Sequence, residues 1–186
     1  MSLAMFSWAI AWTNAKIVNE YMTFYNLVFL RFFFGFISLL PLIILYKVTF
    51  PKAKDLVYVI LPSTLFFIYN ISFFKGTFYG LASEGAVLVT TLNPLVTIIL
   101  VSLIGKSISR NDLLGLIFGV LGGFIIMDIY NNGFLVIFNP HNIYFLVCAL
   151  SWGCMTVSIS YGQKVINPYM FICLCYFFTM IISFPF

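Results

Sequence analysis

Charged side chains are scarce in this sequence. Lysine and arginine number nine and aspartate and glutamate five among 186 residues, so 8% of the chain is charged. A soluble domain carries about 25% charged and about 45–50% apolar residues, whereas 63% of this chain is hydrophobic and 23 residues are phenylalanine. A soluble core of this size cannot hold so much apolar surface. The composition therefore excludes an ordinary soluble domain and favours helices dissolved in a lipid bilayer.

Dense basic segments are missing as well. The net charge is +4, but the cations are spread along the whole chain, which leaves no basic face for a nucleic acid. The sequence also lacks a phosphate-binding glycine loop and a nucleophile–base arrangement. Neither an enzyme nor an ATP-driven pump is predicted, and no cofactor is expected.

Cysteine and histidine give no sign of a metal site. All four cysteines fall inside apolar runs, and His141 is the single histidine. Cys173 and Cys175 point to different sides of a helix, so they do not form a metal-binding pair. A disulfide framework is not expected either, and the cysteines are interpreted as small apolar helix residues. They are Cys148, Cys154, Cys173 and Cys175.

Long apolar runs dominate what is present. A membrane helix needs about 20 mainly apolar residues, and seven such segments can be drawn, which predicts an all-α, multi-pass integral membrane protein. We expect the last segment to stop at Phe186 without a polar anchor. The seven are roughly Ser2–Val18, Phe24–Tyr46, Leu56–Phe74, Ser83–Ile104, Asp112–Tyr130, Ile143–Gly162 and Pro168–Phe186.

The cations in the connections predict how these segments cross the bilayer. Positive loops tend to lie in the cytoplasm, and one set of alternate connections holds six cations while the other holds Lys16 and Lys75. The N-terminus is therefore predicted to be inside, and the connection 131–142, with its Asn-Asn-Gly and Asn-Pro turn signals, outside. The six are Lys47, Lys52, Lys54, Lys106, Arg110 and Lys164.

One short segment occurs twice. Lys16–Met22 reads KIVNEYM and returns as KVINPYM at Lys164–Met170, with four identical positions and two exchanges of Ile and Val. The pair Ser7-Trp8 likewise returns as Ser151-Trp152. Because five predicted helices separate the copies, the second lies upside down. An inverted repeat is typical of secondary transporters, where two halves rock around a site at the midplane.

Charged residues within spans mark functional sites, because each costs about 2.5–3.5 kcal/mol or more near the membrane centre. Arg31 lies about two turns into its helix, and Glu84 is its nearest predicted carboxylate partner. Glu84 can equally pair with Lys75, which lies on the other side of the short turn 76–83. These three residues are candidates either for a structural ion pair or for contact with a substrate or coupling ion.

Pro94 interrupts the fourth predicted helix near its middle. A proline removes one backbone hydrogen bond and frees the carbonyl four residues earlier, here that of Thr90. Thr91 and Asn93 lie beside it. Transporters use such broken helices to present polar groups at mid-membrane. The alternative is a packing kink in which the threonine hydroxyls bond to their own helix.

Two further sets of residues stand out by spacing or type. Gly115, Gly119 and Gly123 recur every four residues, which predicts a face for close helix packing. Five aromatic or amide residues are candidates for lining a cavity, although aromatic residues in membrane proteins more often pack or anchor at the interface. The five are Trp8, Trp12, Tyr69, Asn70 and Trp152. Ser109 and Asp112 predict a capping box at the start of the fifth helix.

Together these pieces resemble the EamA family of the drug/metabolite transporter superfamily. The matching motifs are Ser7-Trp8 with Lys16, Arg31, Phe74-Lys75-Gly76, Leu92-Asn93-Pro94-Leu95, Gly115–Gly123 and Ser151-Trp152 with Pro168. The resemblance implies two inverted five-helix units and transport of small organic metabolites by alternating access, often outward. It also implies a bacterial cytoplasmic (inner) membrane protein. Thr179 stands where the repeat would echo Arg31.

On this basis residues 1–130 are expected to form one complete EamA-type unit, 131–142 an external loop and 143–186 an incomplete second unit. The main hypothesis is a secondary-active exporter or permease whose partners are the bilayer and a small solute. The alternatives are a truncated remnant without transport activity, and a membrane subunit completed by self-association or by a second chain.

Overall fold

The structure is a computed structural model that describes residues 2–105, 107–133 and 137–184. Within these ranges the chain forms eight α-helices and no strand, so the all-α prediction is confirmed. The predicted end of the last span at Phe186 lies outside the described residues, as do Lys106 and residues 134–136. The helices are α1 (Ser2–Val18), α2 (Phe24–Leu45), α3 (Val57–Tyr79), α4 (Ala82–Leu103), α5 (Arg110–Ile126), α6 (Ile129–Asn132), α7 (Ile143–Gly162) and α8 (Pro168–Ile182), with 3-10 turns at Ala53–Leu56 and Pro140–Asn142.

Helix ends follow the local chemistry of the sequence. Ser109 and Asp112 form the predicted capping box, since the Ser109 hydroxyl accepts from the Asp112 amide at 3.1 Å and the Asp112 carboxylate accepts from the Ser109 amide at 3.2 Å. Asn167 caps α8 in front of Pro168, where a proline costs no helical hydrogen bond. The same short polar segments that separate the apolar runs therefore also fix where each helix begins.

The predicted span Asp112–Tyr130 is wrong at its C-terminal end. Helix α5 stops at Ile126 because Asp128 adopts a left-handed backbone conformation with φ of 50°, and the short helix α6 follows. Aspartate tolerates this conformation better than most residues. Helix α3 differs in the other direction, because it continues past the predicted end at Phe74 to Tyr79.

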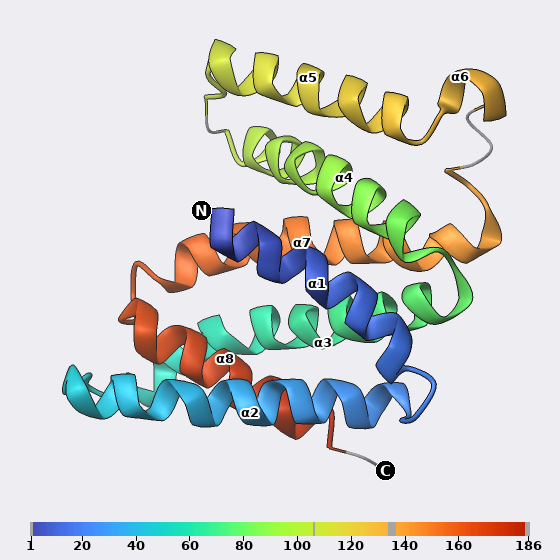
Figure 1. The fold of residues 1–186 in the computed structure, drawn as a ribbon. Coiled ribbons are helices and arrows are strands. Elements are labelled where there is room, and N and C mark those ends of the chain that lie inside the picture. The colour runs from blue at the N-terminus through green and yellow to red at the C-terminus, as the bar shows by residue number, and fades with distance from the viewer. Residues whose placement is uncertain (1, 106, 134–136, 185–186) are drawn as a thin grey trace.

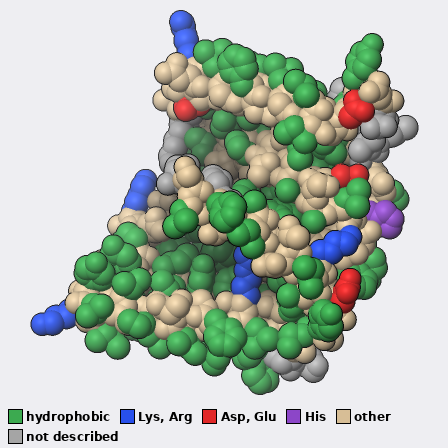
Figure 2. All heavy atoms as spheres, viewed as in Figure 1, with side chains coloured by type: hydrophobic (Ala, Val, Ile, Leu, Met, Phe, Trp, Pro, Cys, Tyr) green, Lys and Arg blue, Asp and Glu red, His purple; other side chains and the backbone are tan. Residues whose placement is uncertain are grey.

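Among the described residues, four helical segments are long and apolar enough to cross a membrane by length and composition, namely Phe24–Leu45, Ala53–Tyr79, Ala82–Leu103 and Pro140–Gly162. The predicted number of seven is not reached on this criterion, since α1 and α5 have 17 residues each and α8 has 15. Large apolar side chains nevertheless cover the outer surface of the shorter helices too (Figure 2), as for Phe118 and Ile125 of α5. An apolar exterior of this kind is suited to lipid.

The two copies of the repeat run in opposite directions. In Figure 1, α1 and α7 are antiparallel, and so are α2 and α8, as an inverted repeat requires. Helix α7 packs between α3 and α4, and α8 packs between α2 and α3. Helix α5 lies at the edge of the bundle and packs on α4. The helix pair of the second copy therefore packs among α2, α3 and α4.

Phe145 anchors α7 in this position. Its side chain is fully buried and lies between two glycines, Gly76 of α3 and Gly85 of α4. A Cβ atom at Gly85 would lie 2.3 Å from the Phe145 ring, and one at Gly76 would lie 2.5 Å from it. Only a residue without a side chain lets the helices approach the ring so closely. This contact sets the height of α7 along the bundle and hence the position of Trp152, two turns further on.

The first copy of the repeated segment fastens α1 to the end of α3. The buried Asn19 amide donates to the Phe74 carbonyl at 2.9 Å and to the Thr77 hydroxyl at 2.8 Å. Lys16 donates to the Gly80 carbonyl at 3.0 Å, just after α3 ends. In the first copy, the repeated Lys and Asn thus hold the end of α1 against the end of α3 by hydrogen bonds. In the second copy, Asn167 caps α8 instead.

Candidate functional site

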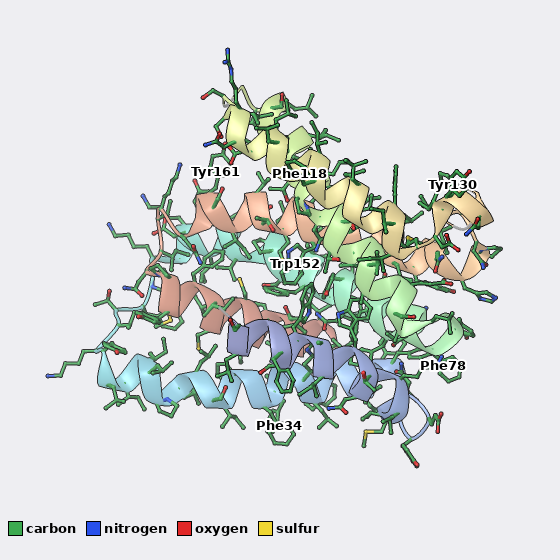
Figure 3. The ribbon with its side chains drawn as sticks, turned by 45° about the horizontal axis from the view of Figure 1, so that its top comes forward. Phe34, Phe78, Phe118, Tyr130, Trp152 and Tyr161 are labelled. Carbon is green, nitrogen blue, oxygen red and sulfur yellow. The ribbon has the colours of Figure 1, made fainter. Side chains whose placement is uncertain are left out.

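A pocket of about 350 Å³ lies where α2 and α3 of the first copy meet α7 and α8. It brings together four of the residues singled out from the sequence, from three different helices. These are Arg31, Tyr69, Asn70 and Trp152. Figure 3 shows Trp152 in the middle of the bundle, whereas Phe34 lies on its outer side. The remaining lining residues are Phe32, Gly35, Ser38, Phe66 and Tyr176.

Arg31 contributes the one charge among the residues that line this pocket. Its guanidinium carbon lies 5.6 Å from the centre of the Phe73 ring, a cation–π distance. The predicted ion pair between Arg31 and Glu84 does not form, and Glu84 does not pair with Lys75 either, in the part of the chain that the structure describes. The reason is the position of Arg31, which faces α3 and the pocket, while Glu84 lies in the first turn of α4.

Asn70 of α3 is a buried polar residue among those that line the pocket. The residue is 2% exposed, and its amide nitrogen donates to the Phe66 carbonyl at 2.8 Å. Because a carbonyl only accepts hydrogen bonds, the nitrogen must occupy that position and the side-chain oxygen must face the other way. That oxygen is buried and has no hydrogen-bond partner.

Aromatic rings form the walls around these polar groups. Trp152 lies against Tyr69 with ring centres 4.8 Å apart. On the opposite side, Tyr176 meets Phe32 edge to face at 5.1 Å. Tyr176 reaches the pocket because Gly35 has no side chain, since a Cβ atom there would lie 2.7 Å from the tyrosine ring. Edge-to-face pairs of this kind hold rings in fixed orientations.

The repeat mates of two pocket residues behave differently. Trp8, the counterpart of Trp152, lines a separate hollow of about 220 Å³ between α1 and α4, together with Trp12 and Thr90. Thr179, the counterpart of Arg31, is fully buried and donates to the Ser63 carbonyl of α3 at 3.1 Å. The pocket is therefore asymmetric, and its charge comes from the first copy alone.

The residues around Pro94 lie away from the Arg31 pocket. The Thr90 hydroxyl donates to the Ala86 carbonyl at 2.7 Å within α4. This bond fits the alternative prediction of a packing kink, in which the threonine hydroxyls bond to their own helix. Thr91 and Pro94 line an open cleft between α4 and α5. Asn93 is 8% exposed, and its side-chain oxygen has no partner. Helix α4 thus presents Thr90 and Thr91 to the cleft beside α5, which is separate from the Arg31 pocket.

The three spaced glycines of α5 all border the cleft between α4 and α5, but they differ in how closely they approach α4. Gly123 lies against Thr91 of α4, where a Cβ atom would come within 2.4 Å of the hydroxyl oxygen. Gly115 and Gly119 line the cleft of about 680 Å³, and an added Cβ atom would meet nothing described within 4 Å. Close packing in this structure therefore rests on Gly123.

Sequence reasoning missed five lining residues of the pocket. Gly35 and Ser38 follow Arg31 at spacings of four and seven, which place all three on one face of α2. That spacing is a signal that the sequence offered. Tyr176 gave no such signal, because its role depends on a complementary glycine in another helix.

The model of the EamA-like transporter family matches residues 1–128, which is more than half of the sequence. The chain belongs to the EamA-like transporter family. Neither a curated protein nor a solved structure matches it. Family membership gives the chain a transporter-type function in the membrane and fits a protein that is not an enzyme.

Proposed function

We propose that this EamA family member is a secondary-active carrier that moves small organic solutes by alternating access. The supporting observation is the pocket, which is lined by helices from both copies of an inverted repeat and contains polar groups within an aromatic wall. Sites of inverted-repeat transporters lie at such junctions near the midplane. Movement of α7 and α8 against α2 and α3 would open the pocket to either side in turn.

The finer features of this function rest on the sequence. The distribution of cations favours a cytoplasmic N-terminus, and the family resemblance favours outward transport in a bacterial cytoplasmic membrane. Glu84, Lys75, Asn93, Thr90 and Thr91 are proposed as candidates for coupling or secondary contacts. None of them lines the Arg31 pocket, so we assign the primary solute contacts to Arg31, Tyr69, Asn70 and Trp152.

Solute flux tests the proposal directly. The purified full chain would be reconstituted into proteoliposomes, and chemically diverse labelled solutes would be screened with and without a proton or sodium gradient. We expect at least one solute to cross faster than in protein-free liposomes, and a gradient to change its accumulation. Uniformly equal rates in both preparations would argue against a carrier.

The open face of α5 favours one alternative, a membrane subunit that requires a second copy or another chain. Gly115 and Gly119 are uncovered along the cleft, and small residues allow helices to approach closely. A Gly119→Cys variant, made after replacing the four native cysteines by alanine, should form a disulfide-linked dimer if two copies meet at this face. A Gly123→Cys variant is the control, since Gly123 faces α4. Monomer alone in native membranes would contradict self-association at this face.

A further inference from the structure

The charge of Arg31 has no protein counter-charge within the described residues. All five acidic residues of the chain are at helix ends or in connections, and none lines the pocket. A guanidinium at membrane depth requires an anion or water as partner. Its contact with the Phe73 ring covers one face of the guanidinium, and its N–H donors have no partner among the described residues. The pocket is thus positively charged and ready for an acceptor.

Whereas Arg31 requires a hydrogen-bond acceptor, the side-chain oxygen of Asn70 requires a donor. The Asn70 residue is only 2% exposed. Its side-chain oxygen can accept a hydrogen bond but has no donor. Buried polar atoms in proteins nearly always have a partner. Arg31 and Asn70 line the same pocket from α2 and α3. A molecule that reached both groups would complement them with an anionic acceptor for Arg31 and an N–H or O–H donor for Asn70.

The walls and the volume define the rest of the molecule. Rings of Phe32, Phe66, Tyr69, Trp152 and Tyr176 surround the polar groups, and such rings pack best against a flat, apolar body. A volume of about 350 Å³ is at the lower end of the range for small-molecule sites. Bulky solutes are excluded, and cations are disfavoured because Arg31 would repel them.

We propose that this pocket binds a small organic anion with a flat apolar body and one hydrogen-bond donor beside its carboxylate. Arg31 would hold the carboxylate, Asn70 would accept from the donor, and the aromatic rings would enclose the body. The proposal rests on the proposed transport function, since it names the substrate class for the same site.

Matched probes test each element of the proposal separately. Binding to the purified full chain would be measured by competition against labelled 2-hydroxy-3-phenylpropanoate. The competitors are 3-phenylpropanoate, which lacks the donor, 3-phenylpropanamide, which lacks the charge, and 3-phenylpropylammonium, which has the opposite charge. We expect 3-phenylpropanoate to compete at least about ten-fold better than the amide, because hydrogen bonds to charged groups are the stronger ones. The ammonium compound should be the weakest competitor.

Variants then connect each preference to its residue. Arg31→Gln should abolish the difference between acid and amide, whereas Arg31→Lys should keep their order because it keeps the charge. Asn70→Leu should remove the advantage of the 2-hydroxyl group while leaving the preference for the anion. A parent protein that binds acid and amide equally, or does not bind the labelled anion, would overturn the proposal, and so would a preference that persists in Arg31→Gln.

Failure of this inference is distinguishable from failure of the carrier function. If the flux screen finds transport of neutral or cationic solutes only, the protein is a carrier and the anion proposal is wrong. If the anions bind with the expected order but no solute crosses the bilayer, the pocket is assigned correctly and the carrier proposal is wrong.

Discussion

Replacing Arg31 by alanine is expected to reduce transport of an anionic solute at least about ten-fold, with an unchanged amount of protein in the membrane. Arg31 provides the only charge among the lining residues of the pocket. A hydrogen bond to a charged group contributes about 1.5–3 kcal/mol, and about 1.4 kcal/mol corresponds to a factor of ten in affinity. The measurement is initial uptake into proteoliposomes with matched protein content.

Arg110→Ala is the matched control. Arg110 is exposed at the start of α5 and does not line the pocket, so its removal should leave the uptake rate close to that of the parent. Thermal unfolding of both variants in detergent would separate a defect in transport from a defect in folding. Equal uptake by the parent and the Arg31→Ala variant would show that Arg31 is not part of the transport site.

The second large effect concerns the packing of Phe145 between α3 and α4. We expect Gly85→Leu to lower the free energy of unfolding by about 3 kcal/mol or more, since overpacking a well-filled core typically costs 1–3 kcal/mol. The ring is fully buried and also contacts Gly76, so a side chain at position 85 cannot be accommodated unless the ring and its neighbours move. Displacement of α7 would also move Trp152 out of the pocket. Thermal or denaturant unfolding in detergent measures the loss.

Gly119→Leu controls for the change from glycine to leucine in a helix. A Cβ atom at Gly119 would meet nothing described within 4 Å, so this variant should be close to the parent in stability. Smaller substitutions test the geometry further. Phe145→Leu combined with Gly85→Ala should recover part of the stability lost in Gly85→Ala alone. If Gly85→Leu and Gly119→Leu behave alike, Phe145 does not fix α7 in the way described.

Much of the secondary structure could be predicted from the sequence. The bounds of α1 and α7 agree with the predicted spans, because a polar segment follows each helix and another precedes α7. The end of α5 could not be predicted, since the break depends on the backbone conformation of Asp128 rather than on hydropathy. The extension of α3 to Tyr79 could not be predicted from hydropathy, because Lys75 directly follows the predicted end of the span at Phe74.

The candidate site was harder to predict than the helices. Arg31, Tyr69, Asn70 and Trp152 could be singled out by residue type, but not their convergence in one pocket. Convergence depends on which face of each helix is turned inward. In a chain whose helices are apolar on all sides, hydrophobic periodicity does not distinguish the lipid-facing side from the buried one.

The inward-facing side of several helices is marked by glycines that pack against aromatic rings of other helices. A single sequence does not reveal which ring meets which glycine. Gly76 and Gly85 receive Phe145, and Gly35 receives Tyr176. Each pair joins residues far apart in the chain, so neither member has meaning without the other. By contrast, the regular spacing of Gly115 and Gly119 predicted a face for close helix packing, but in this structure both residues line an open cleft.

The orientation of the two repeat copies in the membrane is the central claim, and labelling from each side tests it most directly. Tyr21 and Tyr169 are equivalent positions, and both side chains are exposed. After replacement of the native cysteines by alanine, Tyr21→Cys and Tyr169→Cys would be treated with a membrane-impermeant maleimide in intact cells and in inside-out vesicles. We expect the Tyr21→Cys variant to react in intact cells and the Tyr169→Cys variant in inside-out vesicles. Reaction of both variants from the same side would contradict the inverted repeat and the carrier mechanism built on it.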